Sequence, residues 1–294
     1  MTTTPQADFA VTRADLRDRV DAALAVFLAS VDAELRATDP ATAPLIAEIQ
    51  RLLAAGGKRL RPAFCYWGFR AAGGRDGEPI VRASAALELL HTMALVHDDL
   101  MDEAATRRGV ASVHAALETS LPGPDLASRR RAAASATIIV GDLAAVLADR
   151  MFLEAGFDPE VTIDALRRYH RMRTAMAAGQ FLDVAGAAAG DEATARRAAA
   201  LKGGVYTVEG PLAVGAALAG ASATQREALA RFGVPLGEAF QLRDDLIDDE
   251  GAHGATPASV NALVDQARAA LDPEVLDPGA IDALRSLAGL MEMP

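Results

Sequence analysis

Cysteine, lysine and aromatic residues are all scarce in this chain of 294 residues. The one cysteine, Cys65, cannot form an internal disulfide, and no cluster of cysteine and histidine suggests a zinc site. We interpret Cys65 as a small buried hydrophobic residue. Aromatic residues make up 4% of the sequence, whereas alanine, leucine, arginine and glutamate, which favour helices, dominate it. The composition therefore predicts an all-α protein.

An excess of positive charge is also missing. The net charge is −11 and the isoelectric point is near 5.0, which argues against non-specific binding of nucleic acid. Residues 1–8 lack the basic and apolar stretches of a signal peptide. No uninterrupted apolar run reaches the length of a membrane span. We therefore expect a cytoplasmic protein with no transmembrane segment and no nucleic-acid partner.

The basic residues themselves are unevenly chosen. Of 29 lysines and arginines, only Lys58 and Lys202 are lysines. A compact ammonium group and a planar guanidinium are not interchangeable. Each lysine therefore raises the question of why arginine does not stand at that position.

The spacing of apolar residues predicts a succession of long helices. Hydrophobic residues make up 51% of the chain, which is enough to bury a large core. We find no repeat and no linker, so we predict one domain over residues 1–294. The predicted helices are 14–38, 43–54, 61–72, 80–102, 129–155, 159–188, 193–220 and 224–249, followed by two short helices within 258–290.

Two acidic motifs of identical spacing end two of these apolar helices. They are Asp98-Asp99-Leu100-Met101-Asp102 and Asp244-Asp245-Leu246-Ile247-Asp248. Carboxylates at positions i and i+4 share a helix face and destabilise the helix unless they are neutralised. Magnesium takes one or two carboxylates and completes its shell with water and phosphate. One motif alone would equally suit a solvated helix end, but the pair predicts metal sites facing each other across a helical bundle.

A glycine turn rich in cations precedes the third predicted helix. Residues 56–62 read Gly-Gly-Lys-Arg-Leu-Arg-Pro, and such a loop can present N–H groups and cations to a diphosphate. A basic surface turn is the alternative. Arg107 and Arg108 add two cations, and with Gly109 they also fit the end of a helix. Both interpretations of these arginines can hold together.

These motifs resemble the trans-polyprenyl diphosphate synthase family, which makes geranyl, farnesyl, geranylgeranyl and longer diphosphates. The resemblance covers about residues 45 to 250. It implies an isoprenoid synthase fold, a bundle of long helices around a central cavity, and a homodimer. The matching stretches are GGKRLRP (56–62), ELLHTMALVHDDLMDEAATRRG (88–109), GDLAAVLADRMF (141–152), GQFLDVAG (179–186), residues 202–218 and FQLRDDLID (240–248).

The resemblance also implies a role for each matching residue. The implied Mg²⁺ ligands are Asp98, Asp102, Asp244 and Asp248, with Asp99 and Asp245 supporting them. The implied ligands of isopentenyl diphosphate are Lys58, Arg61, His91 and Arg108. The implied ligands of the allylic diphosphate are Arg107, Lys202 and Gln241. Lys202 and the six aspartates of the two acidic motifs are also counted as catalytic. His91 lies two turns before Asp98 on one face, although by itself it would be interpreted as a core histidine.

The reaction so implied joins isopentenyl diphosphate to an allylic diphosphate. Magnesium and the cations neutralise charge on the departing diphosphate, and the allylic cation forms in a dry cavity. Isopentenyl diphosphate, held in a fixed orientation, then attacks this cation. Met93, Ala94 and Leu90 lie where the growing tail would run. No aromatic residue blocks that path, so we expect a geranylgeranyl-like product.

The segment after Asp248 departs from the family pattern. The family continues with Gly-Lys and a later lysine, whereas no lysine follows Lys202 here, and Gly203 stands where threonine is usual. Three explanations stay open: a synthase with a weaker allylic site, a protein of changed function, or a sequence that omits a disordered loop. The changed function would be a class I terpene cyclase or an impaired subunit of a heteromeric synthase. The intact set of isopentenyl diphosphate ligands favours the synthase, because a cyclase needs no such site.

Overall fold

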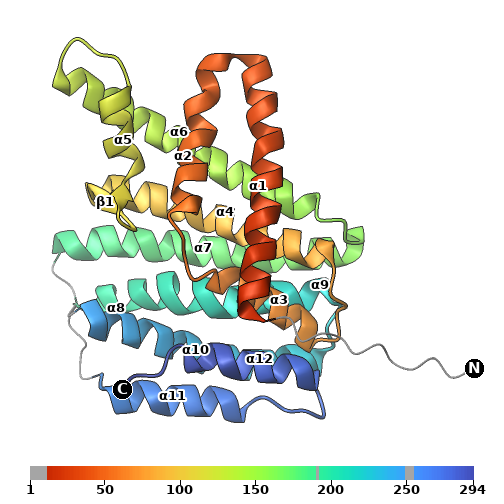
Figure 1. Ribbon diagram of the computed structural model, residues 1–294. Coiled ribbons are helices and arrows are strands. Elements are labelled where there is room, and N and C mark those ends of the chain that lie inside the picture. The colour runs from red at the N-terminus through yellow and green to blue at the C-terminus, as the bar shows by residue number, and fades with distance from the viewer. Residues whose placement is uncertain (1–11, 190–191, 249–254) are drawn as a thin grey trace, which may run out of the picture. The chain divides into compact units, whose positions relative to one another are not determined.

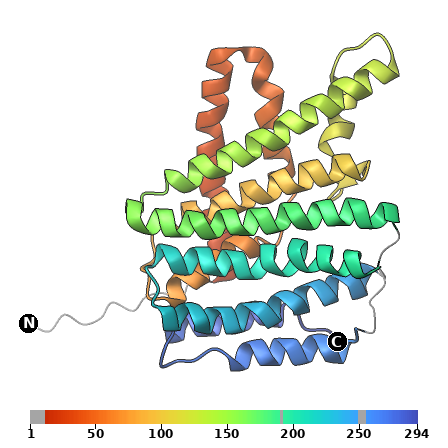
Figure 2. The same cartoon turned by 180° about the vertical axis from the view of Figure 1, so that it is seen from behind.

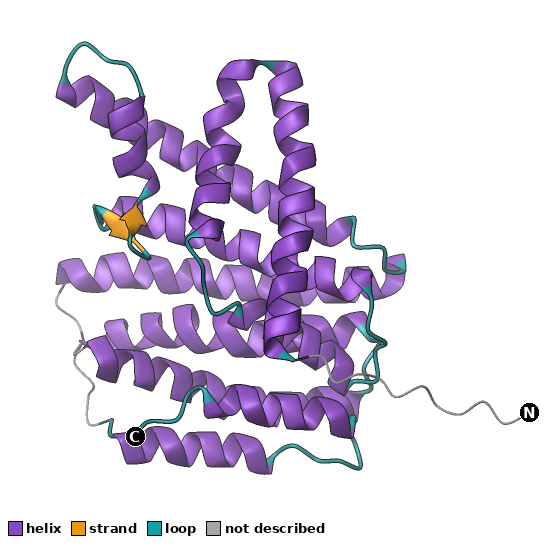
Figure 3. Cartoon of the chain, viewed as in Figure 1, coloured by secondary structure: helices purple, strands orange, loops and turns teal. Residues whose placement is uncertain are grey.

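The computed structural model describes residues 12–189, 192–248 and 255–294. Within these residues the chain is helical apart from loops and one hairpin of two very short strands, as Figure 3 shows. The prediction of an all-α protein is therefore confirmed. The contacts divide the chain into two compact units. Unit 1 comprises Met1–Asp18, Ala63–Asp76 and Asp158–Pro294, and unit 2 comprises Arg19–Pro62 and Gly77–Phe157.

Unit 2 is organised around two long helices, α4 and α6, which lie side by side (Figures 1 and 2). Its elements are α1 (Arg13–Thr38) from residue 19 onward, η1 (Pro40–Thr42), α2 (Ala43–Ala54), α4 (Glu78–Met101), β1 (Thr106–Arg107), β2 (Val110–Ala111), α5 (Val113–Ser120) and α6 (Leu126–Leu153). Helix α4 is buried on every side along residues 83–90. Helix α6 begins where the side chain of Asp125 accepts a hydrogen bond from the amide of Ser128 at 2.7 Å.

The chain leaves α4 through a small hairpin that the sequence analysis did not predict. The helix ends at Asp102, and β1 and β2 then pair with Arg107 opposite Val110. The two turn residues, Arg108 and Gly109, both have positive φ (54° and 78°). This is the backbone of the two-residue turn that suits a hairpin. The interpretation of these arginines as a helix end is therefore wrong, because they form a hairpin turn.

Unit 1 contains the remaining helices. Its elements are the start of α1, α3 (Leu60–Ala71) from residue 63, α7 (Pro159–Ala189), α8 (Glu192–Ala200), η2 (Leu201–Glu209), α9 (Gly210–Leu218), α10 (Ala223–Asp248), α11 (Pro257–Ala269) and α12 (Pro278–Gly289). The path from α8 through η2 to α9 runs between α7 and α10, and α11 packs on α10 (Figures 1 and 2). Gly204 and Gly237 let η2 and α10 approach closely, since a Cβ on Gly204 would lie 2.8 Å from the Gly237 backbone. Cys65 is buried in this unit, as expected.

Several predicted boundaries agree with the structure to within three residues, and the two short helices near the C-terminus are α11 and α12. The predicted glycine-interrupted helix over residues 193–220 is confirmed as a helical stretch, but it is not α-helical throughout. This stretch contains the π-helix η2 between two α-helices. Such wide turns are rare and are frequently found at functional sites. The prediction that residues 1–294 form a single domain stays a prediction.

Two helices are long and apolar enough to cross a membrane, although the sequence analysis found no such run. In α4, 67% of the relevant window is buried, which is typical of a core helix. In α6, only 39% of the window is buried. Length and composition alone are weak evidence for a span, and the core helix of a soluble protein passes the same test.

Candidate functional site

The residues expected at the site divide between the two units. Unit 2 contains Lys58, Arg61, Leu90, His91, Met93, Ala94, Asp98, Asp99, Asp102, Arg107 and Arg108, and unit 1 contains Lys202, Gln241, Asp244, Asp245 and Asp248. Asp248 ends α10, but its side chain lies outside the described residues. The segment 249–254, which departs from the family pattern, also lies outside them. Each unit therefore contains its own group of candidate residues.

The cationic loop of unit 2 is anchored by Arg59, to which the sequence analysis gave no role of its own. The Arg59 side chain is buried and donates to Asp21 at 2.8 Å, to Glu88 at 2.6 Å and to the Leu53 carbonyl at 2.8 Å. Burial by itself lowers the pKa of Arg59, but the two carboxylates outweigh it and raise that pKa. All three nitrogen atoms of the guanidinium group thus donate hydrogen bonds that hold the loop. Only the approach of Asp21, Leu53 and Glu88 in three dimensions reveals this role.

Arg108 reaches this loop from the hairpin turn. Its Nη1 donates to the carbonyl of Gly56, and a Cβ on Gly57 would lie 3.0 Å from the same nitrogen. The glycine therefore leaves room for the guanidinium. Burial lowers the pKa of Arg108, and Arg59, Arg107 and Arg61 lower it further against the opposing effect of Glu88. This region holds more positive charge than its carboxylates neutralise, so it favours an anion.

His91 lies on α4 within the field of the same guanidiniums. Burial lowers its pKa well below 6.5, and Arg61, Arg108 and Arg107 lower it further. His91 is therefore neutral at neutral pH and can donate one hydrogen bond without adding charge. Lys58 is exposed on the adjoining loop. The structure thus brings the predicted isopentenyl diphosphate ligands of unit 2 into one neighbourhood.

The first acidic motif has members in two different environments. Asp99 is buried, with 1% of its side chain exposed, and forms an ion pair with Arg107 at 2.5 Å. Its other oxygen, Oδ2, is buried and makes no hydrogen bond within the described residues. Asp98 is 26% exposed and lies 3.7 Å from Arg107, while Asp102 is exposed at the helix end. The hydrogen bond to Asp99 raises the pKa of Arg107, although burial opposes it.

The second acidic motif belongs to α10. Gln241 donates to Asp245 at 2.6 Å, one helical turn away, and Arg243 lies 3.5 Å from Asp244. A Cβ on Gly203 would lie 1.8 Å from the amide oxygen of Gln241. The glycine that replaces the usual threonine is therefore what leaves room for this position of Gln241.

Lys202 is the second residue of η2 and forms an ion pair with Asp183 of α7 at 2.6 Å. The sequence analysis matched residues 179–186 to the family but gave Asp183 no role. Two features of the sequence could have indicated this pair. Asp183 is an acidic residue within the matching stretch, and Lys202 is one of only two lysines in the chain. Asp183 therefore joins the candidate residues as the partner that positions Lys202.

The acidic motifs suit a metal that is completed by its substrate. Among the described residues, no group of three or more histidine, cysteine, aspartate and glutamate side chains could hold a metal ion. Magnesium needs only one or two carboxylates when phosphate oxygens and water fill its shell. Asp98 and Asp102 offer two hard oxygen ligands at the accessible end of α4. The donor set of unit 2 therefore fits a magnesium–diphosphate complex.

The residues expected to limit chain length lie on α4. Leu90 is fully buried by packing, whereas Met93 and Ala94 are partly exposed. Met93 and Ala94 are therefore the accessible members of the set.

Comparisons with known proteins identify the family of this chain. Residues 43–256 match the family model for polyprenyl synthetase. A geranylgeranyl pyrophosphate synthase of Geoglobus acetivorans is 31% identical over 206 residues, which are 68% of this chain and 58% of that protein. A geranylgeranyl diphosphate synthase of Mycobacterium tuberculosis is 34% identical over 254 residues, 83% of this chain and 66% of that protein. The chain thus spans under three fifths of the Geoglobus protein.

A solved structure also has this fold. The geranylgeranyl pyrophosphate synthase of Corynebacterium glutamicum, complexed with isoprenyl diphosphate and magnesium, aligns with a TM-score of 0.83 at 25% identity. The alignment covers 97% of this chain and 99% of that one, which confirms the predicted isoprenoid synthase fold. The matched family model covers the expected stretch of about 45 to 250. The chain belongs to the polyprenyl synthetase family.

Proposed function

We propose that this protein is a magnesium-dependent prenyltransferase that joins isopentenyl diphosphate to an allylic diphosphate. The observation that carries the proposal is the cluster of cations around neutral His91, placed on the same helix as the first acidic motif. A diphosphate would supply the negative charge that this cluster favours. Relatives whose names include geranylgeranyl and nonaprenyl diphosphate synthases support the same reaction class.

In unit 2, Lys58, Arg61 and Arg108 would bind the diphosphate of isopentenyl diphosphate. Arg59 holds the loop that carries Lys58 and leads into α3, where Arg61 lies. Neutral His91 would donate a hydrogen bond to the same diphosphate. This arrangement fixes the nucleophilic double bond in one orientation.

Asp98 and Asp102 would hold magnesium on the allylic diphosphate, with Asp244 and Asp248 as the second pair. The metal, when bound, supplies positive charge that stabilises the departing diphosphate. Arg107 holds Asp99 and lies near Asp98, so it adds a cation beside the first pair. Within unit 1, Asp183 positions Lys202 and Gln241 is bonded to Asp245, and we propose Lys202 and Gln241 as ligands of the allylic diphosphate.

We propose a geranylgeranyl-like product. Met93 is flexible and Ala94 is small, whereas an enzyme with a shorter product needs a bulky side chain that blocks the growing tail. The relatives differ in product, from geranylgeranyl to nonaprenyl diphosphate. Product length is therefore tested separately from the reaction class.

We also propose that the protein is a cytoplasmic homodimer. Ile139, Val146 and Leu153 of α6 are each more than half exposed and recur every seven residues, with Ile138 beside them. That spacing places them on one stripe of the helix. A second copy would cover this stripe, and mass measurement in solution tests the assembly. Val146→Glu should yield monomers, whereas lipid-dependent solubility would instead favour a membrane role for α6.

The competing functions separate in one assay of diphosphate release. A synthase releases diphosphate from an allylic substrate only when isopentenyl diphosphate is also present. A class I terpene cyclase releases it from a long allylic diphosphate without isopentenyl diphosphate. A well-folded protein that releases none under either condition would be an impaired subunit, and the proposal would fail.

A further inference from the structure

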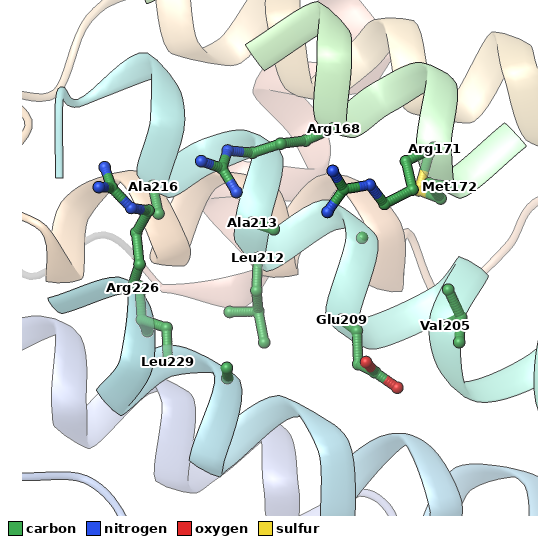
Figure 4. A pocket seen from close by; sticks show the side chains of 12 residues that line it. Arg168, Arg171, Met172, Val205, Glu209, Leu212, Ala213, Ala216, Arg226 and Leu229 are labelled. Carbon is green, nitrogen blue, oxygen red and sulfur yellow. The ribbon is translucent and has the colours of Figure 1, made fainter. Parts of the chain in front are cut away.

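Unit 1 contains a pocket of about 230 Å³ that no candidate site residue lines. Helices α7, η2, α9 and α10 form its walls (Figure 4). Met172 and Leu212, both buried, belong to an apolar floor that also includes alanine and valine side chains. The volume lies below the roughly 300–1,000 Å³ that is typical of pockets for drug-sized ligands. The pocket therefore suits a small molecule.

Three arginines give the pocket a positively charged rim. Arg168 and Arg171 come from α7 and Arg226 from the start of α10, and Figure 4 shows their guanidinium groups along one side. Arg168 forms an ion pair with Asp164 at 3.2 Å, and Arg226 donates to the Ala221 carbonyl. Within the described residues, Arg171 has no carboxylate partner. The rim therefore retains positive charge for a ligand.

Glu209 is the one acidic residue in the lining. It is half-buried, and burial raises the pKa of its carboxyl group. Glu209, together with the Asp164 that pairs with Arg168, offsets two of the three guanidinium charges, so one positive charge remains for an anion. Guanidinium groups bind phosphate oxygens through paired hydrogen bonds.

We propose that this pocket binds a small phosphate- or diphosphate-bearing molecule whose short apolar part rests on the floor beside Met172 and Leu212. Arg171, with Arg168 and Arg226 beside it, binds the anionic group. The ligand also contacts Val205 and Glu209, which lie on η2. A ligand bound in the pocket therefore contacts the same π-helix that carries Lys202 as its second residue. The binding site stands on the pocket itself and does not depend on the catalytic reaction.

Met172 provides a local reporter that separates this pocket from the cations of unit 2. The 294-residue protein, labelled with ¹³C at the methionine methyl groups, is titrated with isopentenyl diphosphate or inorganic diphosphate without magnesium. The Met172 resonance, assigned with Met172→Leu, should shift and saturate. Met93 reports independently on α4, so binding at the proposed active site is distinguished from binding here.

Matched variants make the test specific. Arg168→Ala combined with Arg171→Ala should raise the midpoint, the ligand concentration at which the Met172 resonance has shifted halfway, at least about tenfold. This is the loss of affinity expected when charge-assisted hydrogen bonds are removed. Arg167→Ala removes one positive charge, half of what the double variant loses, from an exposed neighbour outside the pocket and should change the midpoint less than about twofold. Glu209→Gln should lower the midpoint. All variants must keep the wild-type circular dichroism spectrum.

The proposal is overturned if Met172 does not shift at millimolar ligand, or if the double variant keeps the wild-type midpoint. Isopentenyl diphosphate should bind more tightly than inorganic diphosphate because its apolar part is buried. Equal midpoints for isopentenyl diphosphate and inorganic diphosphate would show that the apolar part of the ligand does not bind at the pocket floor.

Discussion

Arg107 and Asp99 form an ion pair that ties the β1–β2 hairpin to the end of α4. The Nε and Nη2 atoms of Arg107 lie 2.7 Å and 2.5 Å from Oδ1 of Asp99. The middle carboxylate of the first acidic motif is thereby committed to the protein itself. Asp98 and Asp102 remain the accessible pair, so the three aspartates divide into one structural residue and two that we propose as metal ligands.

Asp99→Asn should therefore destabilise the fold. The change removes the charge that pairs with half-buried Arg107, and the lost charge-assisted bond should cost about 1–3 kcal/mol of unfolding free energy. Asp98→Asn should cost much less stability, because Asp98 is more exposed and lies 3.7 Å from Arg107. Urea unfolding of the two variants checks this. Equal losses would contradict the division of roles.

Lys58→Ala and Arg59→Ala should behave in opposite ways although the residues are adjacent. Lys58 is exposed, so its loss should raise the KM for isopentenyl diphosphate and leave stability unchanged. Arg59 pairs with buried Glu88, so its loss should cost about 3–5 kcal/mol of stability. Kinetics and denaturant unfolding measure the two effects. An unchanged KM in Lys58→Ala would move the binding site elsewhere.

His91 should make the protein sensitive to acid. Its folded pKa lies below the unfolded value of about 6.5, so between these values the unfolded chain binds more protons. The unfolding free energy should therefore fall as the pH drops below about 6.5. His91→Gln cannot titrate and should lose less stability from pH 7 to pH 5. Denaturant unfolding at both pH values checks the difference, and an identical loss would show that His91 does not contribute.

Gly203→Thr should harm the protein although it introduces the residue usual in the family. A Cβ there would lie 1.8 Å from the Gln241 amide oxygen, so Gln241 must move and its bond to Asp245 must weaken. We expect a raised KM for the allylic diphosphate and a loss of about 1–3 kcal/mol of stability. Gln241→Ala in the same chain should recover the stability. Additive effects of the two changes would show that the residues do not interact.

The sequence predicted the long helices well because their apolar spacing is a local property. The β1–β2 hairpin escaped because its turn is Arg108-Gly109 rather than Asn-Gly, the usual signal for that backbone. The π-helix η2 was not predicted because its wide turns have no compositional signature. Helix α5 follows the hairpin and is only eight residues long, too short for a clear periodic pattern.

The candidate site was predicted in its chemistry but not in its internal pairing. The motifs gave the cations and carboxylates, since their types and spacings stand in the sequence. That Arg59 anchors its loop depends on Asp21 and Glu88, which are 38 and 29 residues away along the chain. The pairing of Lys202 with Asp183 likewise depends on the approach of η2 to α7. Such contacts follow from tertiary packing alone.

The central claim is tested most directly by product analysis with labelled isopentenyl diphosphate, magnesium and each allylic diphosphate in turn. The account predicts elongated prenyl diphosphates, which Asp98→Ala and Asp244→Ala should reduce at least about 100-fold while keeping a folded protein. Asp282→Ala, at an exposed position on α12, should leave the yield unchanged. Well-folded wild-type protein that incorporates no label with any primer would contradict the account.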